Sequence, residues 1–177
     1  MDETFTLLRG DEFAPDVHAA GAAAVWVGSV GYERYKENGD FARRLHAVGV
    51  ERLIDVRELP ISRRRGYAKT ALSEAMAAVG IDYLHIRALG NPKPFRDLYK
   101  SGRTAEGREH YERYLLGEQR AALSELAALL PEKRTALMCV EHDPLTCHRT
   151  VILDALRTSS TSSSPSPKSP SWPPSHA

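Results

Sequence analysis

The sequence predicts an α/β protein with three layers (α/β/α), in which helices cover both faces of a mainly parallel sheet of about four to five strands. Short apolar runs alternate along the chain with stretches whose apolar residues recur at helical spacing, in the order β-α-β-α-β-α-β-α. A helix between successive strands requires parallel pairing, because only a long crossover returns the chain to the same end of the sheet. The length of 177 residues fits one domain with a core of its own.

Three apolar runs in the first half of the chain have the length and composition of buried strands, at residues 22–30, 50–56 and 81–86. A helix is predicted over residues 39–48, because apolar residues recur there at helical spacing and Gly49 follows as a C-terminal cap. A second helix is predicted over residues 71–79, with Thr70 as its N-cap and Gly80 after its end.

The second half of the chain is predicted to add a long helical region, a fourth strand and a final helix. A loop rich in proline, lysine and arginine occupies residues 90–103. Helical spacing then extends over residues 105–130 and ends at Pro131. Residues 135–140 form the fourth predicted strand, and residues 150–156 the final helix.

The composition divides the chain into a single globular domain, residues 1–157, and a tail, residues 158–177. The tail contains nine serines and five of the eleven prolines but no acidic residue. Such a segment cannot bury enough apolar surface to offset the entropy of ordering, so we predict that it is disordered. Residues 1–21 are predicted to be either an N-terminal arm or an extra strand.

Charge and cysteine content exclude several classes of protein. With 24 basic and 23 acidic residues the chain is no polycation, so any attraction to nucleic acid must come from a local patch. Two cysteines are too few for a disulfide scaffold. We expect no membrane association and a cytoplasmic location, because no apolar run approaches the roughly 20 residues of a membrane span and the N-terminus lacks the basic region of a signal peptide. Neither a cofactor nor an oligomeric state is indicated.

Polar side chains follow the end of each predicted strand. Tyr32 follows the first strand, Asp55 and Arg57 end the second, His85 lies in the third and Glu141 follows the fourth. The carboxyl ends of parallel strands share one edge of the sheet, where open α/β proteins bind ligands. Unpaired polar groups at such positions cost on the order of a few kcal/mol each, so we expect them to form one composite site.

The loop after the second strand is basic. From Arg57 to Lys69 it has five basic residues and one acidic residue. Arg63 and Arg64 precede a predicted helix, and guanidinium groups beside helix amides suit a phosphate. Tyr67 is a candidate to stack on a base. A solvated basic loop without a ligand is the alternative.

The segment from residue 139 to 149 holds both cysteines together with two histidines and an arginine. Cys147 is predicted to lie in the first turn of the last helix. The positive end of that helix and the neighbouring Arg149 would then lower the pKa of its thiol. His148 or His142 could act as the base.

Two other roles stay open for this segment. It offers four possible metal ligands, although their spacing fits no common zinc motif: Cys139, Glu141, Cys147 and His148. In a purely structural role, both cysteines would pack as small hydrophobic residues and Arg149 would pair with Glu141 or Asp55. Asp55, Arg57 and His85 could likewise form a polar network without catalysis.

Four blocks of the sequence resemble the family described as "domain of unknown function 488". They are Val27–Glu33; Asp55-Val56-Arg57 with Pro60 and Ser62-Arg63; Tyr83-Leu84-His85 with Leu89-Gly90; and Cys139-x-Glu141, Asp143-Pro144 and Cys147-His148-Arg149. The resemblance covers about residues 25–156. It implies an α/β fold and a site shared by the four blocks, and it implies no particular activity.

Our leading functional hypothesis from the sequence is an enzyme that acts on a phosphate-bearing substrate, either a nucleotide or a nucleic acid. The expected anion-binding and substrate-framing residues are Arg57, Arg63, Arg64, Arg149, Tyr32, Tyr67 and His148. The expected nucleophile and proton-transfer residues are Cys147, His85, Asp55 and Glu141. The alternatives are a non-catalytic nucleic-acid-binding module that uses residues 63–69 and 93–103, and a metal-binding protein.

Overall fold

The structure is a computed structural model that describes residues 6–8 and 25–161. Its core is a sheet with the strand order β1-β2-β5-β3-β4. The strands are β1 (Thr6–Leu8), β2 (Val27–Gly31), β3 (Arg52–Asp55), β4 (Asp82–His85) and β5 (Thr135–Cys139). Strands β2 to β5 pair in parallel, and β1 pairs with β2 in the antiparallel sense. The predicted α/β fold is therefore confirmed.

The late strand β5 occupies the centre of the sheet, between β2 and β3. Its last residue, Cys139, pairs with Gly31 at the end of β2. On its other side Met138 pairs with Asp55 at the end of β3, and Asp55 pairs in turn with His85 at the end of β4. The carboxyl ends of four parallel strands consequently lie side by side along one edge.

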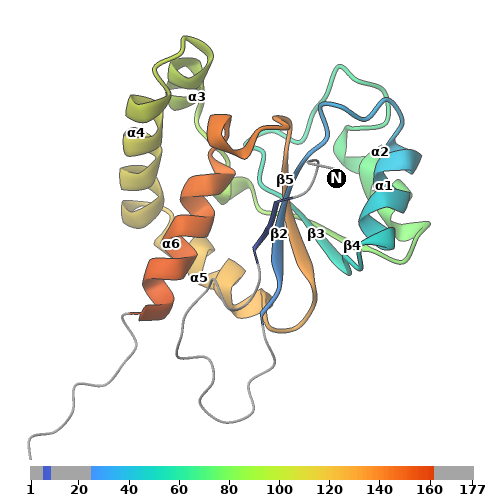
Figure 1. The fold of residues 1–177 in the computed structure, drawn as a ribbon. Helices are drawn as coiled ribbons and strands as arrows, with labels where there is room; N and C mark the ends of the chain where they lie inside the picture. The colour runs from blue at the N-terminus through green and yellow to red at the C-terminus, as the bar shows by residue number, and fades with distance from the viewer. Residues whose placement is uncertain (1–5, 9–24, 162–177) are drawn as a thin grey trace, which may run out of the picture.

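Helices cover both faces of the sheet (Figure 1). Helices α1 (Asn38–Ala47) and α2 (Lys69–Ala77) lie on one face. Helices α4 (Thr104–Gly117), α5 (Arg120–Leu129) and α6 (Arg149–Thr161) lie on the other, and the short α3 (Lys93–Lys100) packs on α4.

The sheet has one apolar cluster on each face, because successive side chains of a strand point to opposite faces. In β5, Ala136 and Met138 pack in the cluster under α1 and α2, whereas Leu137 and Cys139 pack in the cluster under α5 and α6.

Several helix boundaries differ from those predicted. The loop expected over residues 90–103 contains α3. Pro94 does not prevent this helix, because it lies in the first turn, where a missing N–H costs no helix hydrogen bond. The helical region expected over residues 105–130 is two helices, α4 and α5. The N-cap of α2 is Ala68, and Thr70 lies inside the helix.

The two ends of the chain are described only in part. Residues 6–8 form β1, which corresponds to the extra strand that the sequence left as one of two possibilities. Helix α6 continues to Thr161, so residues 158–161 are helical and the expectation of disorder is wrong for them. Residues 162–177 lie outside the described part of the chain. Within that part, no helix has the length and apolar character needed to cross a membrane.

Candidate functional site

A pocket of about 500 Å³ opens at the carboxyl edge of the sheet, between the end of β5 and α3. Its reactive wall comes from the segment after β5 and contains Cys139, Glu141, Cys147 and His148. The facing wall comes from the segment that includes α3 and contains Asn91, Arg96, Tyr99 and Lys100. Apolar side chains of Leu59, Ile61 and Val140 also line it, together with Arg57 from the end of β3.

Cys147 is placed by a short 3-10 turn, η3 (Pro144–Thr146), that brings the chain back toward the sheet. Asp143 caps this turn, since its Oδ1 accepts a hydrogen bond of 2.9 Å from the N–H of Leu145. Cys147 follows in an extended conformation, and α6 begins two residues later at Arg149. The expected position in the first turn of the helix is therefore wrong, and the thiol lies just before the helix.

His148 connects Cys147 to the sheet. Its Nε2 lies 2.9 Å from the carbonyl oxygen of Val56, and its Nδ1 lies 3.7 Å from Cys147 Sγ. Because a carbonyl oxygen only accepts hydrogen bonds, we assign a proton to Nε2. The Nδ1 atom of the neutral ring is then free to accept the proton of the thiol.

The surroundings of Cys147 favour its charged form. Burial alone would raise the pKa of the thiol, but Cys139, Arg149 and His148 together hold it well below the ordinary value. The pKa of His148 is raised by the Cys147 charge in spite of burial. Both shifts favour a thiolate–imidazolium pair at the wall of the pocket.

The other two titratable groups on this wall stay protonated to higher pH. The pKa of Cys139 is raised well above the ordinary thiol value by the contact with Cys147 and by burial. The pKa of Glu141 is raised by burial and by the Cys147 charge. Of the two thiols on this wall, that of Cys147 is therefore the first to lose its proton.

The backbone of the reactive wall is fixed by a close contact with β2. A Cβ atom at Gly31 would lie 1.7 Å from the carbonyl oxygen of Glu141, so only glycine fits. The same carbonyl accepts a hydrogen bond of 2.6 Å from Nη2 of Arg149. Sequence reasoning did not select Gly31 as a site residue, although the Gly-Tyr pair at the end of the first predicted strand was the available signal.

Buried polar atoms without a protein partner gather at this pocket. Among the described residues they include Asn91 Oδ1, Tyr99 OH and Glu141 Oε2 on its walls. Nε and Nη1 of Arg149, which is fully buried and does not line the pocket, also lack a partner. Such atoms are rare in folded proteins, and each costs about 1–3 kcal/mol when nothing binds it. Burial also raises the pKa of Tyr99 to about 12, so its hydroxyl remains a donor. Three residues that line the pocket therefore carry a buried polar atom without a protein partner.

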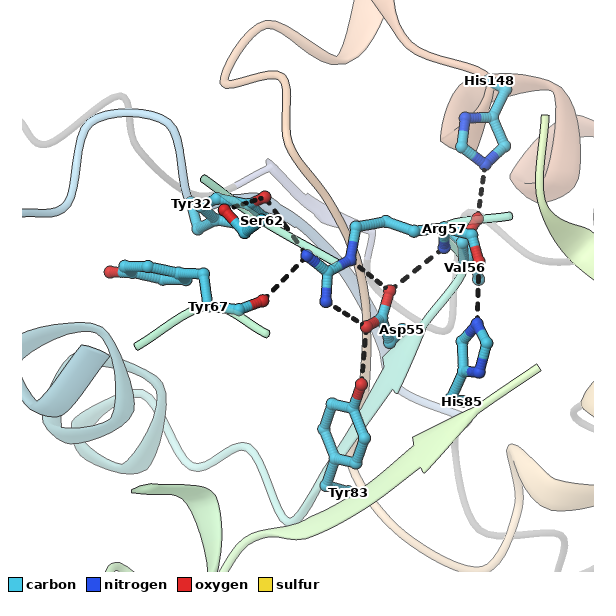
Figure 2. A network of polar contacts seen from close by, with 9 residues as sticks. All are labelled: Tyr32, Asp55, Val56, Arg57, Ser62, Tyr67, Tyr83, His85 and His148. Atoms are coloured by element: carbon cyan, nitrogen blue, oxygen red, sulfur yellow. Dashed lines mark hydrogen bonds and ion pairs between the residues drawn. The ribbon is translucent and has the colours of Figure 1, made fainter. Parts of the chain in front are cut away.

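A second polar network lies beside the pocket and is centred on a buried ion pair (Figure 2). Nε and Nη2 of Arg57 lie 2.8 and 2.5 Å from the two carboxylate oxygens of Asp55. The hydroxyl of Tyr83 donates to Asp55 at 2.6 Å. Nη1 of Arg57 contacts the hydroxyl of Tyr32 at 3.2 Å and the carbonyl oxygen of Tyr67 at 2.9 Å.

This network occupies the guanidinium group that was expected to bind an anion. Burial opposes the Arg57 charge, but Asp55 outweighs it and the pKa of Arg57 is raised. Each nitrogen of the group already has a protein partner, so a bound anion would have to compete with these contacts. The role of Asp55 is to hold Arg57, and no contact joins it to Cys147.

Tyr32 and Tyr67 stack on each other, with ring centroids 4.4 Å apart and an interplanar angle of 13°. Both are buried, and the hydroxyl of Tyr67 donates to the carbonyl oxygen of Glu37 at 3.0 Å. Neither ring lines the pocket, so the structure adds no support to the expectation that they frame a substrate or stack on a base.

His85 and the basic loop are also separated from the pocket. His85 Nε2 lies 2.8 Å from the carbonyl oxygen of Arg57 (Figure 2). The preceding residue, Val56, has the carbonyl oxygen that contacts His148. Nη1 of Arg64 contacts the carbonyl oxygens of Tyr32, Glu33 and Tyr35, so this side chain anchors the loop. Arg63 is exposed to solvent and does not line the pocket.

The structure therefore brings together Cys147, His148, Glu141 and Arg149 from the expected set and leaves His85 and Asp55 outside. Three donor atoms could contact one metal ion, since those of Cys139, Cys147 and His148 lie within 4.8 Å of one another. Glu141 does not belong to that group, so the four-ligand set expected from the sequence is not assembled.

Helix α3 supplies pocket residues that the sequence had offered only within the stretch 93–103 of the nucleic-acid-binding alternative. Arg96, Tyr99 and Lys100 have the i, i+3, i+4 spacing of one helix face, which was the available signal. Nη1 of Arg96 pairs with Glu58 at 2.9 Å, which ties this helix to the segment after β3. A Cβ atom at Gly90 would lie 2.2 Å from Cα of Glu58, so the two segments also meet through their backbones.

Comparison with known proteins gives one match. The family model described as "Domain of unknown function DUF488" matches residues 38–156, well over half of the chain. That range includes every residue of both pocket walls and leaves out the first resembling block, residues 27–33. No curated protein and no solved structure matches the chain.

Proposed function

The chain belongs to the family of domain of unknown function DUF488, and we propose that it is an enzyme that uses the Cys147 thiolate as a nucleophile toward a phosphate-bearing substrate. The observation that carries this proposal is the contact of 3.7 Å between Cys147 Sγ and His148 Nδ1 at the wall of the pocket. A nucleophile, a base within reach and a third group that orients the base form the usual arrangement for covalent catalysis. Here Val56 supplies the orienting carbonyl.

The chemistry follows from the charges of the pair. The thiolate attacks phosphorus, so that an S–P bond forms and the P–O bond to the leaving group breaks. The imidazolium of His148 gives its Nδ1 proton to the departing oxygen. His148, now neutral, takes a proton from the water that hydrolyses the thiophosphate, and the thiolate is restored.

A phosphate-bearing substrate is supported by the cations around the pocket. Arg96 and Lys100 lie on the facing wall, and the buried Arg149 adds positive charge near Cys147. Guanidinium and ammonium groups bind phosphate through charge-assisted hydrogen bonds. The volume of about 500 Å³ suits a small ester rather than a folded macromolecule.

The proposal is tested by turnover of p-nitrophenyl phosphate and a panel of nucleoside mono- and diphosphates. We expect Cys147→Ser to abolish turnover with little change in melting temperature, because serine keeps the volume but not the charge. The matched control is Ser124→Ala on the exposed face of α5, which should retain full activity. Undiminished turnover by Cys147→Ser would contradict the nucleophile assignment.

A rival function is nucleic-acid binding by the exposed side chains of Arg63 and Arg65. A labelled oligonucleotide should then bind with an affinity that falls steeply with salt, because each phosphate contact releases counterions. Replacing both arginines with glutamine should weaken that binding and leave turnover of a small ester intact. The enzyme proposal expects the reverse pattern from Cys147→Ser.

A second rival is a soft metal ion held by the three donors near Cys147. Elemental analysis of protein purified without chelator distinguishes the two ideas. A stoichiometric ion that is lost in both Cys139→Ser and Cys147→Ser would favour the metal site over the nucleophile.

A further inference from the structure

The two cysteines of the chain are both free thiols and both line the pocket. Cys139 ends β5, whereas Cys147 follows η3, and their sulfur atoms lie within 4.8 Å of each other. They are 7% and 1% exposed, respectively, so the pocket is their route to solvent. Nucleophilic chemistry at Cys147 needs only one of these sulfur atoms.

We propose that Cys139 and Cys147 form a redox pair, in which a small hydroperoxide oxidises Cys147 and Cys139 converts the product into a reversible disulfide. This inference goes beyond the proposed function, because it requires no phosphate-bearing substrate.

The oxidation proceeds in balanced steps. The Cys147 thiolate attacks one oxygen of hydrogen peroxide, so that an S–O bond forms, the O–O bond breaks and hydroxide leaves. The product is a sulfenic acid. The Cys139 sulfur then attacks Cys147; an S–S bond forms, the S–O bond breaks, and the departing hydroxyl takes the thiol proton to become water. Two equivalents of a thiol reductant restore both cysteines and are themselves joined in a disulfide.

The electrostatics assign different roles to the two sulfur atoms. Arg149 and His148 stabilise negative charge on Cys147, which makes it the first to react. The charge on Cys147 also keeps Cys139 protonated. Conversion of Cys147 to a neutral sulfenic acid removes that charge, so Cys139 becomes easier to deprotonate at the moment when it has to attack.

The backbone lets the sulfur atoms close to the roughly 2.05 Å of a disulfide. The Cys139 side is fixed, because the strand end pairs with Gly31. Cys147 itself is buried, but it follows a turn whose Asp143, Leu145 and Thr146 are exposed, and the proposal requires this turn to shift toward the strand.

The experiment exposes the reduced full-length protein to graded hydrogen peroxide and follows intact mass and tryptic peptides. We expect the chain to lose the mass of two hydrogen atoms, to give a Cys139–Cys147 cross-linked peptide and to recover with dithiothreitol. Cumene hydroperoxide should react more slowly, because the thiols are reached only through the pocket. Sulfinic acid at Cys147 without a cross-link, or a cross-link between two chains, would overturn the proposal.

Two variants separate the roles of the cysteines. Cys139→Ser should accumulate a sulfenic acid at Cys147 that dimedone traps and that further peroxide oxidises to sulfinic acid. In Cys147→Ser, Cys139 should stay reduced at the peroxide concentration that oxidises the natural chain. Oxidation of Cys139 in that variant at the natural rate would overturn the assignment. The graded oxidation of the natural chain needs no variant and no substrate, so its outcome is independent of whether the phosphate chemistry is correct.

Discussion

The ring of His148 joins the backbone of Val56 to the side chain of Cys147. Nε2 lies 2.9 Å from the carbonyl oxygen, and this contact leaves Nδ1 to face the sulfur. The end of β3 therefore determines which tautomer the thiol meets. In metal sites and in catalytic triads the second nitrogen of a histidine is held in the same manner.

Replacement of His148 by glutamine should separate orientation from charge. The glutamine amide can still donate toward Val56, so we expect the protein to fold, but it cannot carry a positive charge beside Cys147. The pH at which iodoacetamide alkylates Cys147 at half-maximal rate should lie below about 8.5 in the natural protein and should rise in the variant. An unchanged midpoint would show that His148 does not stabilise the thiolate.

Arg149 should have a related effect, through its charge and through the hydrogen bond that it donates to the carbonyl oxygen of Glu141. It is fully buried and lowers the pKa of Cys147. We expect Arg149→Met to raise the midpoint of Cys147 alkylation, since methionine keeps much of the volume and removes the cation. Arg113→Met is the control, because Arg113 is exposed on α4 and pairs with Glu109 on the same helix. A shift of equal size in both variants would argue against a local role.

The ion pair of Asp55 and Arg57 should be the most sensitive polar contact in the fold. The side chains of Asp55 and Arg57 are 0% and 4% exposed, so loss of one partner leaves the other buried and unpaired. We expect Asp55→Asn to lower the free energy of unfolding by about 3–5 kcal/mol, measured by urea denaturation at pH 7.

Glu106→Gln provides the matched control for this ion pair. Its partner Arg103 is 60% exposed, so the loss should stay below about 1 kcal/mol. Equal losses at the two sites would mean that burial does not decide the strength of the pair.

Gly31 should be intolerant of even one added carbon. A methyl group would overlap the carbonyl oxygen of Glu141, so Gly31→Ala must displace the wall that carries Cys139 and Cys147. We expect a lower melting temperature and slower alkylation of Cys147. Gly117→Ala at the end of α4 meets no atom within 4 Å and should be neutral or stabilising by up to about 1 kcal/mol. A destabilisation by Gly117→Ala as large as that by Gly31→Ala would contradict this account.

The sheet and its reactive edge could be predicted because both depend on local pattern. Apolar runs separated by helical segments dictate parallel pairing, and parallel strands bring their carboxyl ends together. Cys147, Glu141 and Arg149 could be grouped because they lie in one short segment of the sequence. The strand order could not be predicted, because nothing in the spacing of the elements indicates that β5 inserts between β2 and β3.

Side-chain direction accounts for most of the differences between the site predicted from the sequence and the site in the structure. Asp55 and His85 end neighbouring strands, but Asp55 turns to Arg57 and His85 to the backbone carbonyl of that residue. Tyr67 follows three arginines and is nevertheless buried on Tyr32. Such choices depend on which partners the fold brings near, and these partners are distant in the sequence.

The separate origin of the two pocket walls has a consequence for how this protein can diversify. Both cysteines lie in the eleven-residue stretch from Cys139 to Arg149, whereas Asn91, Arg96 and Tyr99 come from another part of the chain and line the facing wall. Substitutions on α3 can therefore change what fits beside Cys147 without any change to that stretch. A library randomised at Arg96, Tyr99 and Lys100 alone would sample new ligands while both cysteines, His148 and Arg149 are kept.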